Sequence, residues 1–265
     1  MRRTPLGLIL IASLALVAAG CDIGSGSVPS DDTGDLATPI PTIDVEAPGS
    51  EPDTTGAPVE TGATEPQIAG FDGWKLLNAS DVDIGATEDG FAMTLLRKAL
   101  WFDTQQGVLF YSTIDGNFRL SATVSTSKTS DSSSDPGGGG VTMFAGLMAR
   151  SETARENYVF VVTGVDGHGL AVETKSTLDG HSSFEQPAWP SGDADLELCR
   201  IGTAFTLWKR PLNSDLDYAL AAKYDRPDLK GTIEVGANIY ADGTPDITAQ
   251  FSDLSIEPLD PGEAC

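Results

Sequence analysis

The stretch FRLSATV, residues 118–124, decides the class of fold. Its apolar side chains stand at every second position, with Arg, Ser and Thr between them, and IEVGANI at residues 233–239 repeats the pattern. A period of two places the apolar side chains on one face of a β-strand and the polar ones on the other. The chain therefore contains strands with one buried face, which is typical of antiparallel sheets.

The same alternation recurs through residues 67–265, whereas helical periodicity is nearly absent. Further strands are predicted at residues 91–96, 107–112, 141–149, 157–163, 169–175, 195–199, 205–208, 217–223 and 247–256. Asp-Gly pairs, such as Asp115-Gly116 and Asp179-Gly180, separate several of them and indicate tight turns. Many strands without helices predict an all-β domain, either a sandwich or a barrel. In the last strand the alternation changes phase near Ser252-Asp253, which predicts a bulge.

Composition narrows the classes of partner. The 265 residues include 39 acidic and 16 basic side chains, and the net charge of −23 argues against nucleic acid as a partner. With two His and three Cys, a zinc cluster or a multi-disulfide framework is not expected.

The N-terminus reads as a signal for export. Two arginines precede an apolar run at residues 6–19, which is too short to span a membrane, and the run ends in Ala18-Ala19-Gly20-Cys21. This ending resembles the lipobox of bacterial lipoproteins, in which the cysteine becomes the acylated first residue. The resemblance implies a signal peptide at 1–21, lipidation of Cys21 with acyl chains such as palmitate, and a membrane partner. The protein would then be exported and anchored to the bacterial cell membrane, facing the extracytoplasmic side. The alternative is an ordinary signal peptide with an accidental cysteine.

Residues 22–66 are predicted to form a disordered linker. This segment holds ten acidic residues and no Lys or Arg, and it is rich in Pro, Thr and Gly. It contains too little apolar surface to offset the entropy of ordering it. We expect a spacer, or alternatively a glycosylated stalk, that precedes a folded domain at 67–265.

Two further features of the folded domain leave alternatives open. Cys199 and Cys265 would face an oxidising compartment, where they either pair in a disulfide or remain two unrelated thiols. Residues 125–140 are rich in Ser, Asp and Gly and are predicted to form a long mobile loop. Its Asp131 and Asp135 could contact a cation, although a solvated loop is favoured.

Several short pieces in a fixed order resemble one family. DGNFRL at 115–120, AGLMAR at 145–150, NYV at 157–159, AFT at 204–206 and FSDL at 251–254 are similar to a bacterial concanavalin A-like domain family of the "regulation of enolase" type, whose function is unknown. The resemblance covers about residues 101–257 and implies a two-sheet jelly roll of the kind found in lectins and glucanases. It implies no established chemistry. Structural calcium is an expectation from the wider fold, without a readable set of ligands.

The sequence shows no catalytic motif. The Glu-x-Asp-x-x-Glu string of the glucanases is missing, and Asp193, Asp195 and Glu197 are expected on a solvent-facing strand surface. Glu173 is a further strand carboxylate with no visible partner. The sequence contains no P-loop, no dinucleotide-binding fingerprint and no Cys-x-x-Cys motif, so we expect no cofactor.

Aromatic residues are the better indication of function. Sugar rings stack on Trp and Tyr, and Trp101, Trp189 and Trp208 are candidates for such contacts. Arg150, which follows the strand at 141–149, is a candidate for reaching a concave face. The sequence thus favours a non-catalytic module that binds a glycan or a cell-envelope polymer. The alternatives are a glycoside-active enzyme of the glucanase type and a protein–protein interaction sandwich.

Overall fold

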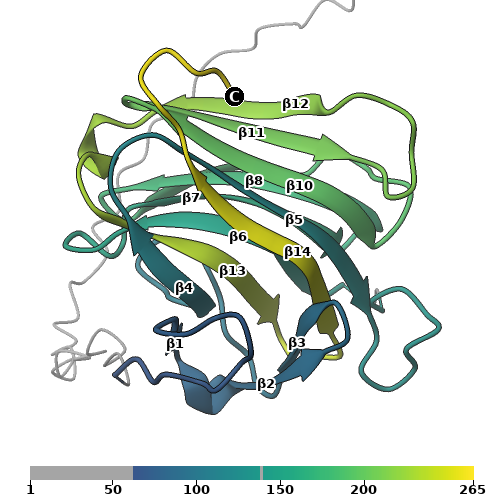
Figure 1. Ribbon diagram of the computed structural model, residues 1–265. Helices are drawn as coiled ribbons and strands as arrows, with labels where there is room; N and C mark the ends of the chain where they lie inside the picture. Colours follow the sequence, from purple (N-terminus) through teal and green to yellow (C-terminus); the bar gives the residue numbers. More distant parts are fainter. Residues whose placement is uncertain (1–61, 138–139) are drawn as a thin grey trace, which may run out of the picture. The chain divides into compact units, whose positions relative to one another are not determined.

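The computed structural model describes residues 62–137 and 140–265, and in this part of the chain nearly all regular structure is β-strand (Figure 1). The predicted signal peptide, Cys21 and most of the predicted linker lie outside the described residues. At the domain's start, Thr64 and Leu76 exchange backbone hydrogen bonds of 3.1 and 2.7 Å, so β-pairing begins before residue 67.

The strands form two antiparallel seven-stranded sheets. In spatial order the first sheet contains β1 (Lys75–Leu77), β4 (Val108–Ile114), β13 (Ile233–Asp242), β6 (Thr142–Ser151), β7 (Tyr158–Val165), β8 (Leu170–Leu178) and β9 (His181–Glu185). The second sheet contains β12 (Ala219–Asp225), β11 (Ala204–Arg210), β10 (Asp193–Ile201), β5 (Phe118–Ser127), β14 (Thr248–Pro258), β3 (Gly90–Leu95) and β2 (Val82–Thr87). Two short 3-10 helices, η1 (Ala79–Asp81) and η2 (Pro227–Leu229), complete the described elements.

The two sheets pack face to face as a β-sandwich, which confirms the predicted fold class. Figure 1 shows β5, β10 and β14 of the second sheet lying over β6, β7 and β13 of the first. The alternating residues of FRLSATV, in β5, and of IEVGANI, in β13, meet in the core between the sheets. Burial of these apolar side chains supplies the main driving force for folding.

A second apolar cluster lies on the other face of the first sheet, which we call its outer face. Leu109 of β4, Phe144 and Met148 of β6, Phe160 of β7 and Tyr240 of β13 belong to it. These residues alternate along their strands with residues of the inter-sheet core, so the strands are buried on both faces. The expectation of a single buried face is therefore wrong for residues 233–239.

The segment 96–107, between β3 and β4, covers this outer face. The Ala99 carbonyl accepts a hydrogen bond of 2.8 Å from the Ala241 amide of β13, and the Trp101 carbonyl accepts one of 2.8 Å from Lys175 of β8. The backbone amide of Asp103 donates to the Ser182 hydroxyl of β9 at 2.8 Å. Segment 96–107 is therefore tied to three strands of the first sheet.

The region predicted as a long mobile loop is shorter and more ordered than expected where the structure describes it. Strand β5 extends to Ser127. Beyond it, the Asp131 carboxylate accepts hydrogen bonds from the hydroxyls of Ser133 and Ser134 at 2.7 and 2.6 Å, and Asp135 accepts one of 3.3 Å from the Gly192 amide. Asp131 therefore holds the loop itself, and Asp135 ties the loop to the connection between β9 and β10.

Strand β14 contains the predicted bulge. Its pairing with β5 shifts register between Ser252 and Ser255, and Asp253 has a left-handed φ of 55°. The bulge changes which face the following side chains occupy.

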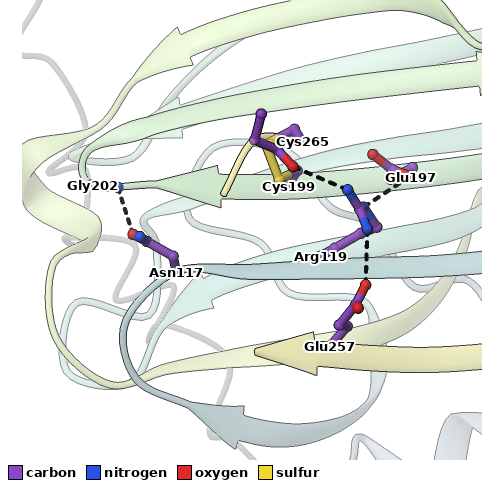
Figure 2. Close-up of a disulfide and its surroundings, with 8 residues drawn as sticks. Asn117, Arg119, Glu197, Cys199, Gly202, Glu257 and Cys265 are labelled. Carbon is purple, nitrogen blue, oxygen red and sulfur yellow. Dashed lines mark hydrogen bonds and ion pairs between the residues drawn. A yellow bond between two sulfur atoms is a disulfide. The ribbon is translucent and has the colours of Figure 1, made fainter. Parts of the chain in front are cut away.

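Cys199 and Cys265 are paired in a disulfide and are not two unrelated thiols. Cys199, on the outer face of β10, forms a disulfide with Cys265 at the end of the sequence (Figure 2). Beside it, Arg119 donates to the Glu257 carboxylate at 2.8 Å and to the Ala264 carbonyl at 3.1 Å. These contacts fasten the C-terminal segment across the second sheet.

Candidate functional site

A pocket with a volume of about 280 Å³ opens on the outer face of the first sheet, beside segment 96–107. We call it the outer-face pocket. The residues that define its chemistry come from β8, β9, β13, the start of the β9–β10 connection and segment 96–107; they are Phe102, Glu173, Lys175, Phe184, Gln186 and Tyr240.

Strand register brings the pocket residues together. Glu173 and Lys175 lie two apart in β8, so both point to the outer face. A two-residue turn at Asp179-Gly180, where both residues have positive φ, joins β8 to β9. This hairpin pairs Lys175 with Phe184, and on the other side β7 pairs Lys175 with Phe160.

Lys175 is surrounded by aromatic rings. Its ammonium lies 5.0 to 5.5 Å from the ring centres of four side chains, Phe102, Phe160, Phe184 and Tyr240. The same nitrogen lies 2.9 Å from Oε1 of Glu173 and donates to the Trp101 carbonyl. Burial lowers the pKa of Lys175, and the Glu173 carboxylate opposes that shift.

Two more polar groups complete the pocket. The Gln186 side-chain amide donates a hydrogen bond to Oε2 of Glu173, which fixes the carboxylate. The Tyr240 hydroxyl is buried beside Glu173 without a well-formed hydrogen bond to the described residues. Burial, and then the Glu173 charge, raise the pKa of Tyr240 well above its usual value. A buried hydroxyl of this kind is a candidate partner for a polar ligand.

The pocket also has an accessible aromatic surface. Phe184 is 44 % exposed, although it packs edge-to-face on Phe102 with ring centres 6.2 Å apart. An exposed ring beside fixed amide, hydroxyl and carboxylate groups is the arrangement that binds sugars, whose apolar ring faces stack and whose hydroxyls form hydrogen bonds.

A larger pocket of about 440 Å³ lies on the outer face of the second sheet. Its walls are mainly hydroxyl groups of β5, β14 and the segment 132–134, with Asp135, Asp193 and Gln250. It offers no aromatic ring for stacking, and Asp135 already holds Gly192. The smaller outer-face pocket is therefore the better candidate site.

The structure corrects the prediction for Trp101. Trp101 has 0 % exposure, and its ring packs edge-to-face on Tyr158 with centres 5.3 Å apart. Segment 96–107 carries this residue into the outer-face cluster, so its ring cannot stack on a ligand. Only its backbone carbonyl contributes to the site, through Lys175.

Arg150 is likewise buried rather than available to a ligand. Its guanidinium lies 2.5 Å from Glu234 of β13, donates to Gln106 at 2.7 Å and lies 5.8 Å from the centre of the Trp101 ring. The paired charges support the cover formed by segment 96–107, which corrects the expectation that Arg150 reaches a binding face.

Trp189 and Trp208 are half-buried, and neither lines the outer-face pocket. Trp189 donates through its indole to the Asp193 carbonyl at 3.0 Å, and Lys209 lies 4.8 Å from its ring centre. Trp208 lies on the outer face of β11, and its indole nitrogen is buried without a hydrogen-bond partner among the described residues. The structure does not bring the predicted tryptophans into one site.

Asp193, Asp195 and Glu197 of β10 lie on the outer face of the second sheet, as predicted, and two of these carboxylates are engaged by basic side chains. Asp195 accepts hydrogen bonds from Thr123 and Arg210 at 2.7 and 2.6 Å, and Glu197 lies 3.4 Å from Arg119. Among residues 62–137 and 140–265, no three His, Cys, Asp or Glu side chains are grouped so that they could hold a metal ion. In the same residues, no helix is long and apolar enough to cross a membrane.

Sequence reasoning missed most of the pocket. Glu173 is a recognisable strand carboxylate in the sequence, and its partner Lys175 lies two residues later on the same face of the strand. That i, i+2 spacing of opposite charges was a usable signal. Long-range packing brings the other four residues to the site, and no local pattern in the sequence indicates it; they are Phe102, Phe184, Gln186 and Tyr240.

Comparison with known proteins supports the fold. No protein-family model and no curated protein matches the chain. A functionally unknown protein from Saccharomyces cerevisiae is similar in structure, with a TM-score of 0.59 and 13 % identity; the match covers 72 % of this chain and 99 % of that protein. The GH43 protein BlXynB from Bacillus licheniformis has a TM-score of 0.51 and 11 % identity, over 63 % of this chain and 33 % of that one. At these identities the likenesses show a shared β-sandwich fold.

Proposed function

We propose that the protein is an exported, lipid-anchored carbohydrate-binding protein of bacteria, in which the outer-face pocket holds a sugar of a glycan or cell-envelope polymer. The observation that carries the binding proposal is the pocket itself: the exposed ring of Phe184 stands beside the fixed Glu173–Gln186 pair and the Tyr240 hydroxyl. These groups supply both kinds of contact that a sugar requires.

Binding, rather than hydrolysis, is favoured by the state of the pocket's carboxylates. Glu173 is engaged by Lys175 and Gln186, and Asp242 at the rim is engaged by Lys98 at 2.5 Å. A glycosidase needs one carboxyl group as a proton donor and a second as a base or nucleophile. Glu173 is therefore not free for such a role, and Asp242 stands at the exposed rim in an ion pair with Lys98.

The anchor in the proposal rests on the sequence. The apolar run at residues 6–19 followed by Ala18-Ala19-Gly20-Cys21 supports export and acylation of Cys21, and the acidic linker at 22–66 would separate the domain from the membrane. Membership of the concanavalin A-like family of the "regulation of enolase" type belongs to the same proposal. The net charge of −23 favours partners other than nucleic acid.

A glycan array tests the proposal. The full chain carrying Cys21→Ser, which removes the acylation site, is screened, and hits are confirmed by calorimetric titration. We expect saturable binding to one class of glycan. An array without a reproducible hit, together with recovery of a specific envelope protein in a pulldown, would replace the proposal with the protein–protein interaction alternative.

A further inference from the structure

We infer that the outer-face pocket selects uncharged sugar residues and rejects both uronic acids and amino sugars, because the Glu173–Lys175 pair leaves it without a free charge. This inference rests on the proposed carbohydrate binding and specifies the class of ligand.

Both members of the pair are removed from water. The side chains of Glu173 and Lys175 are 1 % and 4 % exposed, and their charged atoms lie 2.9 Å apart. Each is also held by a neutral group, since Gln186 donates to Glu173 and Trp101 accepts from Lys175. The two opposite charges are therefore paired with each other within the pocket, and neither is left for a charged ligand.

The charged residue at the rim of the pocket is also paired with an opposite charge. Asp242 lines the pocket, and its carboxylate lies 2.5 Å from the ammonium of Lys98. A charged ligand would lose its hydration water on entering the pocket. The pocket has no unpaired opposite charge to replace that water. Burying a charge without such a partner is strongly unfavourable.

The Tyr240 hydroxyl, which lines the pocket together with Thr142, suits a hydroxyl group of a ligand. The Tyr240 side chain is fully buried, and its hydroxyl can both donate and accept. The raised pKa of Tyr240 keeps this group uncharged over the physiological range. A volume of about 280 Å³ is slightly below the range of about 300–1,000 Å³ that is typical of ligand pockets. The pocket therefore fits a single sugar ring.

Matched sugars and a charge exchange test the inference. Glucose, glucuronate and glucosamine, and the corresponding galactose series, are titrated into the full chain carrying Cys21→Ser. We expect one neutral sugar to bind at least about 10-fold more tightly than its uronate and its amino analogue. Equal binding of a charged analogue would overturn the inference but leave carbohydrate binding intact. If none of the six sugars binds, both this inference and its assignment to the pocket fail.

Variants of the pair should change the preference in opposite directions. Glu173→Gln leaves the Lys175 charge unpaired. The affinity for the uronate should therefore rise at least about 10-fold relative to the affinity for the neutral sugar. Lys175→Met should favour the amino sugar by a similar factor, and the double variant Glu173→Gln/Lys175→Met should restore the neutral preference. Ratios that stay the same in both single variants would contradict the inference.

The rim provides a test that does not depend on the buried pair. Circular dichroism and thermal unfolding show whether each variant folds. Asp242 is exposed, so Asp242→Asn should leave the fold intact. This variant should shift the binding preference toward the uronate by about 3-fold. The shift is smaller than that expected for Glu173→Gln because water screens the charges at the rim. If Glu173→Gln does not fold, the absence of a shift in Asp242→Asn overturns the inference.

Discussion

Lys175 and Glu173 form an ion pair of 2.9 Å that lies beneath an open pocket rather than inside the main core. Four aromatic rings enclose the ammonium, and they come from β7, β9, β13 and segment 96–107. Cation–π contacts of this kind are stabilising when the cation is desolvated. The pair thus joins the cover of the outer face to the sheet and forms the floor of the candidate site.

The cover formed by segment 96–107 should be sensitive to crowding at Gly107. A methyl group there would lie 2.6 Å from the indole nitrogen of Trp101, so we expect Gly107→Ala to lower the free energy of unfolding by about 1–3 kcal/mol. In the control Gly85→Ala, on β2, the new methyl group meets no atom within 4 Å. This variant should lower the free energy of unfolding by much less than Gly107→Ala does. Urea unfolding compares the two variants. Equal stabilities would mean that the Trp101 ring is not packed against Gly107.

The Cys199–Cys265 disulfide should stabilise the domain through the unfolded state. It closes a sequence separation of 66 residues, for which the chain-entropy value is about 4 kcal/mol. We expect the double variant Cys199→Ser/Cys265→Ser to lose about 2–4 kcal/mol in urea unfolding. A loss below about 0.5 kcal/mol would show that the bridge does not constrain the chain.

Asp131 should titrate well below the ordinary pKa of an aspartate. Hydrogen bonds from the Ser134 and Ser133 hydroxyls and the Ser133 amide lower its pKa to about 2. Because the folded pKa lies below the unfolded value of 3.8, the stabilisation is present above about pH 4 and is lost as the pH falls toward 2. Carboxyl NMR titration measures this value. Ser134→Ala should raise the pKa of Asp131, and an ordinary value in the unsubstituted chain would contradict the loop structure.

Cys21 is predicted to carry the membrane anchor. When the chain is expressed in a bacterial host, we expect it to partition into the detergent phase and to incorporate labelled palmitate. Cys21→Ser should abolish both, whereas Cys199→Ser/Cys265→Ser should abolish neither. Recovery of Cys21→Ser in the detergent phase would contradict the lipobox interpretation.

The sheets could be predicted from sequence because their main signal is local. The period-two pattern at residues 118–124 and 233–239 identifies two strands of the two sheets, and the phase change near Ser252 identifies the bulge. The short strands β1, β2 and β9 were not predicted. In β9 most side chains are exposed, so the strand carries no alternation of burial.

The site could be predicted much less well, because long-range packing determines it. Trp101 and Arg150 resemble ligand contacts in the sequence, but segment 96–107 folds over the first sheet and buries both. Conversely, Phe184 becomes a pocket residue only because the Asp179-Gly180 turn sets the register that pairs it with Lys175. Local patterns in the sequence do not predict how one segment packs across another.

Calorimetric titration of a Phe184→Ala variant tests the central claim most directly. The sugar that the unsubstituted chain binds is titrated into Phe184→Ala, into Leu220→Ala as a matched exposed side chain on β12, and into Trp189→Ala/Trp208→Ala. Aromatic ring contacts contribute about 0.5–1.5 kcal/mol beyond the burial of their area, so we predict that Phe184→Ala weakens binding at least about 5-fold, which is about 1 kcal/mol. The other two variants should bind as the unsubstituted chain does. Unchanged affinity in Phe184→Ala, with loss of affinity in Trp189→Ala/Trp208→Ala, would contradict the assignment of the outer-face pocket.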